Sequence, residues 1–267
     1  MADVDTVVAR LTRGAGERFT TSTANVVVTL AGESRPRSVL LRTMSSTGGG
    51  PVLTLEQATP AIGPWSAARA AVPFVSYFVG NLDAAGKRLA AQGFRRVALS
   101  ERFAFWQGLG GVLVRVATTR PTQAPGPESR AGLGPIRSFT LIACDIDAVK
   151  RQLGAALGVH WKAPMPVPLP WQYGDGSGTV LVHQVHATTE RSPHISVESL
   201  DPDPAQRCTP DSTPVHFVYF TQNVADAERR LAAAGMAHIG RVPGMTTYFR
   251  VADGGPFFEV GSTSFEV

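Results

Sequence analysis

The stretch Tyr219-Phe220-Thr221-Gln222-Asn223 joins an apolar, strand-like segment to a helix-like one. It has a counterpart 142 residues earlier, in Tyr77-Phe78-Val79-Gly80-Asn81. The two helix-like segments also end alike, in Arg230-Leu231-Ala232-Ala233-Ala234-Gly235 and Arg88-Leu89-Ala90-Ala91-Gln92-Gly93. These stretches follow one another in the same order and at the same spacing. The region around residue 219 is therefore a second copy of the region around residue 77.

The same offset continues outward from these stretches. It relates Pro193–Glu198 to Pro51–Glu56 and Asp145–Val149 to Asp3–Val7, with no insertion between them. An offset kept over about ninety residues indicates a tandem duplication. A chain of 267 residues has room for two domains of about 100–150 residues each.

A segment rich in proline and glycine lies between the two copies. We therefore predict an N-terminal domain at residues 1–120, a linker at 121–135 and a C-terminal domain at 136–267.

Composition bounds the function classes. Apolar residues make up 43% of the chain and charged residues 17%, and no apolar run approaches the ~20 residues of a membrane span. The acidic start is unlike a signal peptide, so we expect a cytoplasmic protein. Although the net charge is +4, the arginines are scattered rather than gathered in a stripe, which argues against nucleic-acid binding. Cys144 and Cys208 lack metal-type spacing and are expected to stay reduced.

Each copy reads as strand, helix and several strands, used twice. In the second copy Asp145 and Asn223 suit helix N-caps, and Gly158 and Gly235 suit helix ends. The first copy begins at its first helix, so the strand that would match residues 138–143 is absent. The first sheet should therefore lack one strand or borrow one.

A βαβββ unit used four times, with a His in the first strand and a Glu in the last, resembles the vicinal oxygen chelate superfamily of glyoxalases, bleomycin-resistance proteins and extradiol dioxygenases. The most telling residues are Val215-His216-Phe217 and Asp253-Gly254-Gly255-Pro256-Phe257-Phe258-Glu259-Val260. The resemblance covers nearly the whole chain. It implies an α+β fold of tandem glyoxalase-like domains, each a pair of βαβββ units forming a half-open sheet around a cup.

The resemblance also implies where metal ligands would lie, on the first and last strands of each unit. In the second copy these positions are Ser138, Ser196 (or Glu198 on the same strand face), His216 and Glu259. Only His216 and Glu259 are residue types that the family uses as ligands.

The first copy departs further from the family pattern. It has Thr54 (with Glu56), Phe74 in place of His216 and Arg115 in place of Glu259. Phenylalanine offers no ligand atom and arginine repels a cation. We expect this domain to be degenerate, and either structural or shaped for an organic ligand.

Side chains alternate between the two faces of a strand. If His216 points into the cup, its strand neighbours two residues away point there too. The same reasoning on the other strands gives an apolar floor with a few polar groups, as in small-molecule sites. The expected floor is Ser138, Thr140, His194, Ser196, Glu198, His216, Val218, Phe220, Phe257 and Glu259.

Two chemistries fit these residues. In one, His216 and Glu259, with Glu198, bind a divalent metal such as Zn, Fe, Ni or Mn. In the other no cofactor is present, and His216 is a general base oriented by Glu259 or Glu198. In both, His216, Glu259 and Glu198 are the predicted catalytic residues.

The predicted function is that of a superfamily enzyme acting on a small, largely apolar organic molecule by lyase, isomerase or dioxygenase-like chemistry. The alternative is a metal-free small-molecule-binding or drug-sequestering protein. The expected partner is a small molecule, without nucleic acid or membrane, and the chain is expected to be a monomer or homodimer.

Overall fold

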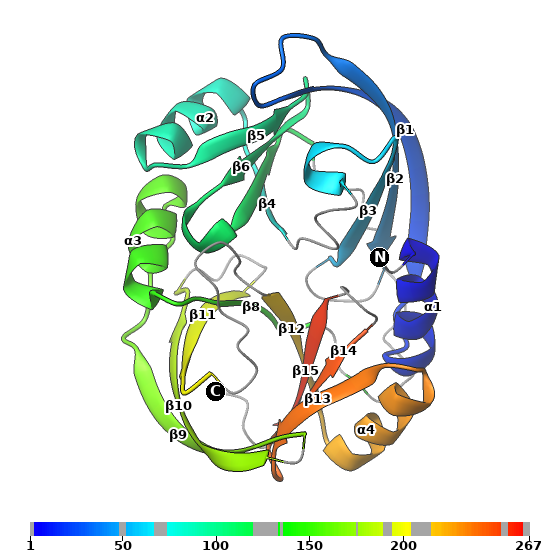
Figure 1. Ribbon diagram of the computed structural model, residues 1–267, viewed down its shortest axis with the longest axis vertical. Helices are drawn as coiled ribbons and strands as arrows, with labels where there is room; N and C mark the ends of the chain where they lie inside the picture. The colour runs from blue at the N-terminus through cyan, green and yellow to red at the C-terminus, as the bar shows by residue number, and fades with distance from the viewer. Residues whose placement is uncertain are drawn as a thin grey trace.

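A computed structural model describes residues 3–47, 52–66, 74–119, 133, 136–174, 176–188, 194–203, 215–251 and 256–263. Its strands form two sheets, one in each half of the chain (Figure 1). The mixture of helices and strands in two similar halves confirms the predicted α+β fold. The predicted linker lies outside the described residues except for Leu133, and the domain boundaries stay predictions.

The N-terminal half contains two longer helices and two short 3-10 turns among its strands. In chain order they are α1 (Val4–Gly14), β1 (Phe19–Leu30), β2 (Arg37–Ser46), β3 (Thr54–Thr59), η1 (Gly63–Trp65), β4 (Phe74–Phe78), α2 (Leu82–Ala91), β5 (Arg95–Leu99), β6 (Phe103–Gln107), η2 (Leu109–Gly111) and β7 (Leu113–Ala117).

The C-terminal half repeats this order and begins one strand earlier. Its elements are β8 (Ser138–Ile142), α3 (Ile146–Leu157), β9 (Met165–Tyr173), β10 (Gly176–His186), β11 (His194–Asp201), β12 (Val215–Thr221), α4 (Val224–Ala233), β13 (Ala237–Val242), β14 (Thr246–Arg250) and β15 (Phe257–Ser262).

The two sheets differ by one strand, as predicted. The C-terminal sheet closes into a barrel in which β8 lies between β11 and β12. The N-terminal sheet runs β3-β2-β1-β5-β6-β7-β4, so the counterparts of β11 and β12 are its two ends. Among the described residues no strand fills the position between β3 and β4. The missing strand therefore leaves the first sheet open.

A short pairing of β9 with β13, at Tyr173 with Gly240 and Gln172 with Arg241, joins the two halves of the C-terminal sheet. The equivalent pairing in the N-terminal half joins β1 to β5 at Thr29 and Leu30. The sheet expected to be half-open is thus closed in the C-terminal half, because both β8 and this short pairing are present.

Helix ends follow the expected chemistry. The side chains of Asn81, Asp145 and Asn223 each accept a hydrogen bond from the backbone N–H three residues later, which satisfies a free donor of the first turn. Gly158 and Gly235 follow their helices with φ of 70° and 83°, a region that glycine adopts without strain.

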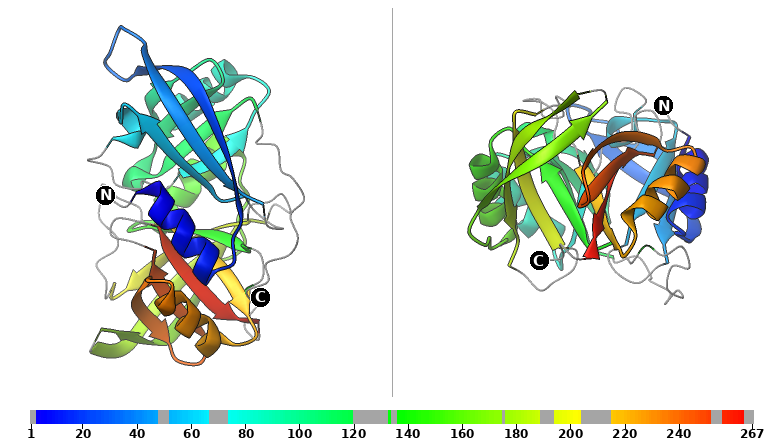
Figure 2. Two further views of the ribbon diagram at one scale, coloured as in Figure 1. Left: turned by 90° about the vertical axis from the view of Figure 1, so that its right-hand side faces the viewer. Right: turned by 90° about the horizontal axis from the view of Figure 1, so that it is seen from below.

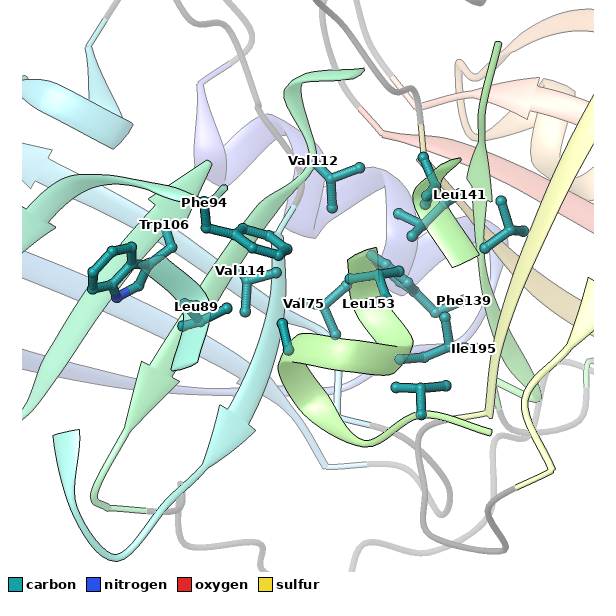
Figure 3. Close-up of a cluster of buried hydrophobic side chains, with 14 of the residues drawn as sticks. Val75, Leu89, Phe94, Trp106, Val112, Val114, Phe139, Leu141, Leu153 and Ile195 are labelled. Atoms are coloured by element: carbon teal, nitrogen blue, oxygen red, sulfur yellow. The ribbon is translucent and has the colours of Figure 1, made fainter. Parts of the chain in front are cut away.

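The two halves are packed together because a helix of each half contacts a helix of the other. One cluster joins α3 to α2 and β4 (Figure 3), and another joins α1 to α4 and the outer face of the barrel (Figure 2). Gln152 of α3 bridges the halves directly, since its side chain accepts from the N–H of Leu109 and donates to the carbonyl of Gln92. The halves therefore share continuous hydrophobic cores.

The structure also bears on the expectations for the cysteines and for membrane-spanning helices. Cys144 is disulfide-bonded, so the expectation that it stays reduced is wrong, and the chain's other cysteine, Cys208, lies outside the described residues. Within the described ranges, no helix has the length and apolar character needed to cross a membrane. The cytoplasmic location stays a prediction.

Candidate functional site

The candidate site lies at the centre of the C-terminal barrel, where strand pairing brings distant residues together. His216 of β12 is paired with Thr140 of β8 on one side and Phe257 of β15 on the other. Thr140 is in turn paired with Ser196 of β11. Three strands that are remote in sequence thus present their inward residues to His216.

The imidazole of His216 lies between two carboxylates. Its Nε2 is 2.9 Å from Oε2 of Glu259, and its Nδ1 is 3.8 Å from Oε1 of Glu198. His216 is fully buried, Glu198 is 5% exposed at its side chain and Glu259 is 17% exposed. Among the described residues, the two carboxylates are the groups that approach the ring nitrogens of His216. Glu259 is the member of the group most open to solvent.

Glu259 is held in its ionised form by its neighbours. Burial acts to raise the pKa of its carboxyl, but the contact with His216 and hydrogen bonds from Thr246 and Tyr248 outweigh burial and lower that pKa. The Thr246 hydroxyl donates to Oε1 of Glu259 at 3.0 Å. A carboxylate with this set of donors is ionised at neutral pH.

Aromatic side chains enclose the polar group. The Tyr248 ring meets the His216 ring edge to face at 5.9 Å, and Trp171 packs against Tyr248 at 4.7 Å. Valines and other apolar residues of β9, β10, β13 and β14 complete this interior cluster. The charged groups therefore lie in a mostly apolar surrounding, which strengthens electrostatic interactions.

Thr246 and Tyr248 were missed by the sequence analysis. Both lie on β14, where Tyr248 is paired with Glu259. Their alternation along the strand is visible in the sequence, but the pairing of β14 with β15 that makes them neighbours of Glu259 is not. We name His216, Glu198, Glu259, Thr246 and Tyr248 the C-terminal cluster.

The other predicted floor residues are only partly gathered at this cluster. Thr140 and Ser196 are fully buried and share a 2.7 Å hydrogen bond with each other, so each hydroxyl has a partner. Ser138 is half-buried and paired with Val218, which is itself paired with Glu259.

The remaining floor residues lie towards the ends of their strands. Phe220 lies against Gly261, and Phe257 lies beneath the guanidinium of Arg250. His194 lies on β11, and its side chain is outside the described part.

Comparison with solved structures agrees with this architecture. The chain superposes on a variant of 4-hydroxymandelate synthase from Streptomyces coelicolor, with a TM-score of 0.60 at 13% identity, over 98% of this chain and 89% of that one. It also superposes on the 2,3-dioxygenase LapB from Pseudomonas sp. KL28, with a TM-score of 0.54 at 10% identity, over 99% and 92%. The chain has the vicinal oxygen chelate fold. No family model and no curated protein matches the sequence.

The N-terminal half has the same fold with different residues at the matching positions. Ser76 is paired with Arg115 as Val218 is with Glu259, so the register confirms that Arg115 replaces Glu259 and that Phe74 replaces His216. Phe105 is paired with Arg115, and Tyr248 is paired with Glu259. Phe105 therefore replaces Tyr248 in the N-terminal half.

Glu56, the counterpart of Glu198, is held by fixed donors. Its carboxylate accepts hydrogen bonds from Nη1 of Arg115 at 2.8 Å and from Nε1 of Trp65 at 3.0 Å. The guanidinium of Arg115 also lies over the ring of Phe103. We name these residues, with Phe74 and Phe105, the N-terminal cluster.

The vicinal oxygen chelate resemblance implies a divalent metal, which His216, Glu198 and Glu259 would have to bind together. Glu259 and Glu198 approach opposite nitrogens of the His216 ring, so the three groups do not converge on one point. Within the described part of the chain, no group of three His, Cys, Asp or Glu side chains has a metal-binding arrangement. Two converging donors are fewer than the three protein ligands of catalytic zinc sites. The described residues therefore do not fit a resident metal.

Proposed function

We propose that this protein is an enzyme of the vicinal oxygen chelate fold that moves a proton on a small, largely apolar organic molecule. The reacting site is the C-terminal cluster. The observation that carries the proposal is the His216 ring, fully buried between Glu259 and Glu198. A structural histidine needs only one hydrogen-bond partner, whereas this ring has a carboxylate beside each of its two nitrogens.

The roles of His216 and Glu259 are revised from the sequence-based expectation. His216 was predicted as a base or a metal ligand, and its side chain has no exposed surface. Glu259 retains exposed surface, and its lowered pKa keeps it ionised at neutral pH. We therefore assign proton abstraction to the Glu259 carboxylate and a positioning role to His216.

The proposed step is proton abstraction from a carbon next to a carbonyl. The C–H bond breaks, its electrons pass into the carbonyl as an enolate, and the proton is bound by Glu259. Return of the proton to another carbon, or to the other face, gives an isomer without any oxidant or reductant. His216 positions the Glu259 carboxylate through its contact at Nε2, and Glu198 lies at the opposite ring nitrogen, Nδ1.

The substrate class follows from the surroundings of Glu259. Trp171, Tyr248 and the interior valines offer apolar and aromatic contacts, and Thr246 offers a single hydroxyl nearby. Such a lining favours an aryl or branched aliphatic carbonyl compound over a highly charged one.

Solvent exchange tests this assignment without knowledge of the natural substrate. The protein is incubated in D₂O with a panel of aryl ketones and aryl 2-oxo acids, and loss of the α-proton signal is followed by NMR. We expect exchange with wild type and a reduction of about 10²–10⁴-fold in Glu259→Gln. Glu17→Gln, which alters a buried carboxyl in the other half, is the matched control and should exchange at the wild-type rate.

Two outcomes would contradict the proposal. One is equal exchange by wild type and Glu259→Gln. The other is exchange that requires added Zn, Fe, Ni or Mn and disappears with a chelator. Binding of panel members by wild type with no exchange of any of them would favour the drug-sequestering alternative. The Phe74 and Arg115 replacements in the N-terminal cluster already point towards binding by shape in that half.

A further inference from the structure

Arg250 is a cation on the inner face of the C-terminal barrel. It follows Tyr248 by two residues on β14 and is paired with Phe257 of β15, two residues before Glu259. Side chains alternate along a strand, and Phe249 packs in the cluster on the outer face of the barrel. Arg250 therefore faces the interior, on the same side of the sheet as Tyr248 and Glu259.

The guanidinium of Arg250 lies on an aromatic ring. Its Cζ is 4.9 Å from the centre of the Phe257 ring. A planar guanidinium stacked in this way keeps its N–H donors free at its edge. Among the residues that the structure describes, no carboxylate pairs with it. A half-buried charge without a counter-ion costs free energy, which a bound anion would offset.

The N-terminal half shows that the fold does not need this charge. On β6, Gln107 has the register position that Arg250 has on β14, two residues beyond the aromatic ring of each cluster. A neutral amide thus replaces the guanidinium in that half. The arginine of the N-terminal cluster, Arg115, differs from Arg250 because it is already paired with Glu56 at 2.8 Å. The guanidinium free to bind an anion lies in the half that contains the proposed reacting site.

Arg250 is close enough to Glu259 for one small molecule to contact both. The two residues are diagonal neighbours across β14 and β15, a relation in which α-carbons are about 7–8 Å apart. We propose that Arg250 binds a carboxylate of the substrate, so that the molecule from which Glu259 abstracts a proton is a carbonyl compound with one carboxylate near its acidic carbon. This inference rests on the proposed function for the proton transfer, whereas the carboxylate binding is testable without it.

The charges of the site give such a molecule one orientation. The planar fork of an arginine matches the two oxygens of a carboxylate. Glu259 and Glu198 would repel an anionic group placed against them. The carboxylate therefore lies at Arg250, and the acidic carbon is presented to Glu259.

A matched pair of probes tests the carboxylate site. The first, 3-phenylpropanoate, carries the carboxylate, and the second, 3-phenylpropanamide, carries a neutral amide in its place. Neither has a ketone on which Glu259 can act, and Kd for each is measured by NMR titration. We expect Arg250→Gln to raise Kd for the acid at least about tenfold, because a hydrogen-bonded charge pair is lost, and to leave Kd for the amide unchanged. Gln107 at the matching position indicates that the fold accepts this substitution.

Two further variants serve as controls. Arg241→Gln removes the same charge from a side chain that is 49% exposed on β13, and it should leave both Kd values unchanged. Arg250→Lys keeps the charge without the planar fork and should give an intermediate Kd for the acid. Equal weakening of acid and amide by Arg250→Gln, or equal weakening of the acid by Arg250→Gln and Arg241→Gln, would overturn the proposal.

Solvent exchange separates this inference from the proposed function. Phenylpyruvate and 1-phenylpropan-2-one share a benzyl ketone and differ in a carboxylate against a methyl group. Arg250→Gln should raise KM for exchange of phenylpyruvate at least about tenfold and leave KM for the ketone unchanged. Exchange with the same KM in wild type and Arg250→Gln would overturn the role of Arg250 and leave that of Glu259 standing. Acid binding that depends on Arg250, without exchange by wild type, would overturn the role of Glu259 alone.

Discussion

The C-terminal and N-terminal clusters occupy equivalent positions in two copies of one fold. Each contains a buried glutamate, but the side chains that face this glutamate differ. Glu56 is bonded to Arg115 and Trp65, whose donors cannot be lost near neutral pH. Glu198 instead faces the imidazole of His216, with its Oε1 3.8 Å from Nδ1 of the ring. The group that faces the buried glutamate therefore changes from a guanidinium in one half to an imidazole in the other.

The aromatic side chains of the two clusters also differ in their polar atoms. Phe74 packs edge to face on Phe105 at 5.1 Å, as His216 packs on Tyr248 at 5.9 Å. The ring geometry is thus kept while the polar atoms are removed. A position can be preserved for packing in one copy and carry chemistry in the other.

The largest expected effect comes from making the C-terminal cluster resemble the N-terminal one. His216→Phe should fold, because Phe74 already occupies the matching position beside a matching ring. We expect α-proton exchange to fall about 10³-fold, because Glu259 loses the ring that positions it. The pKa of Glu259 should rise at the same time, since its contact with His216 lowers that pKa. Both are measurable by NMR.

The reverse change, Phe74→His, is the control for this substitution. It places an imidazole in a cluster where Arg115 stands at the position of Glu259, so no exchange activity should appear. Retained activity in His216→Phe would show that the two clusters differ in packing alone.

The next effect concerns stability. Glu56→Ala leaves the largely buried Arg115 without its carboxylate, at an expected cost of about 3 kcal/mol in the free energy of unfolding. Glu198→Ala should cost less, because Glu198 lies 3.8 Å from the imidazole of His216, whereas Glu56 lies 2.8 Å from the guanidinium of Arg115. Denaturant unfolding measures both. The double variant Glu56→Leu with Arg115→Met should unfold close to wild type, and a large loss there would mean that the ion pair itself stabilises the fold.

The smallest effect is a pH dependence of stability. The folded pKa of Glu259 is below its ordinary value of 4.5, so its ionised form stabilises the fold above that pH, and this contribution is lost as pH falls through the folded pKa. Glu259→Gln should therefore flatten the acid limb of the stability curve.

Glu17 should have the opposite effect on the pH dependence of stability, because its pKa is raised rather than lowered. Burial raises its pKa, outweighing a hydrogen bond from Tyr219, so ionisation of Glu17 costs stability as pH rises through its folded pKa. Glu17→Gln should accordingly stabilise the protein at neutral pH. Thermal unfolding between pH 3 and pH 7 measures both variants, and parallel curves for the two would contradict the assignment.

Local sequence patterns determined much of this protein. The constant offset indicated the duplication, Asn81, Asp145 and Asn223 marked helix starts, and the absence of a counterpart to residues 138–143 predicted the missing strand. The replacement of His216 by Phe74 was also visible from alignment of the copies. The helix starts depend on residues near each other in sequence, and the other features come from comparing the two copies of the repeat.

Tertiary structure alone decided how the site is built. Which ring nitrogen of His216 faces which carboxylate depends on β8, β11, β12 and β15 meeting in one barrel. The closure by β9 and β13, and the approach of Thr246 and Tyr248 to Glu259, likewise follow from non-local pairing. A strand's sequence fixes which side chains share a face, but the atoms opposite that face belong to remote segments. For that reason the sequence singled out His216 and Glu259 as candidates, and only the fold shows which groups lie beside them.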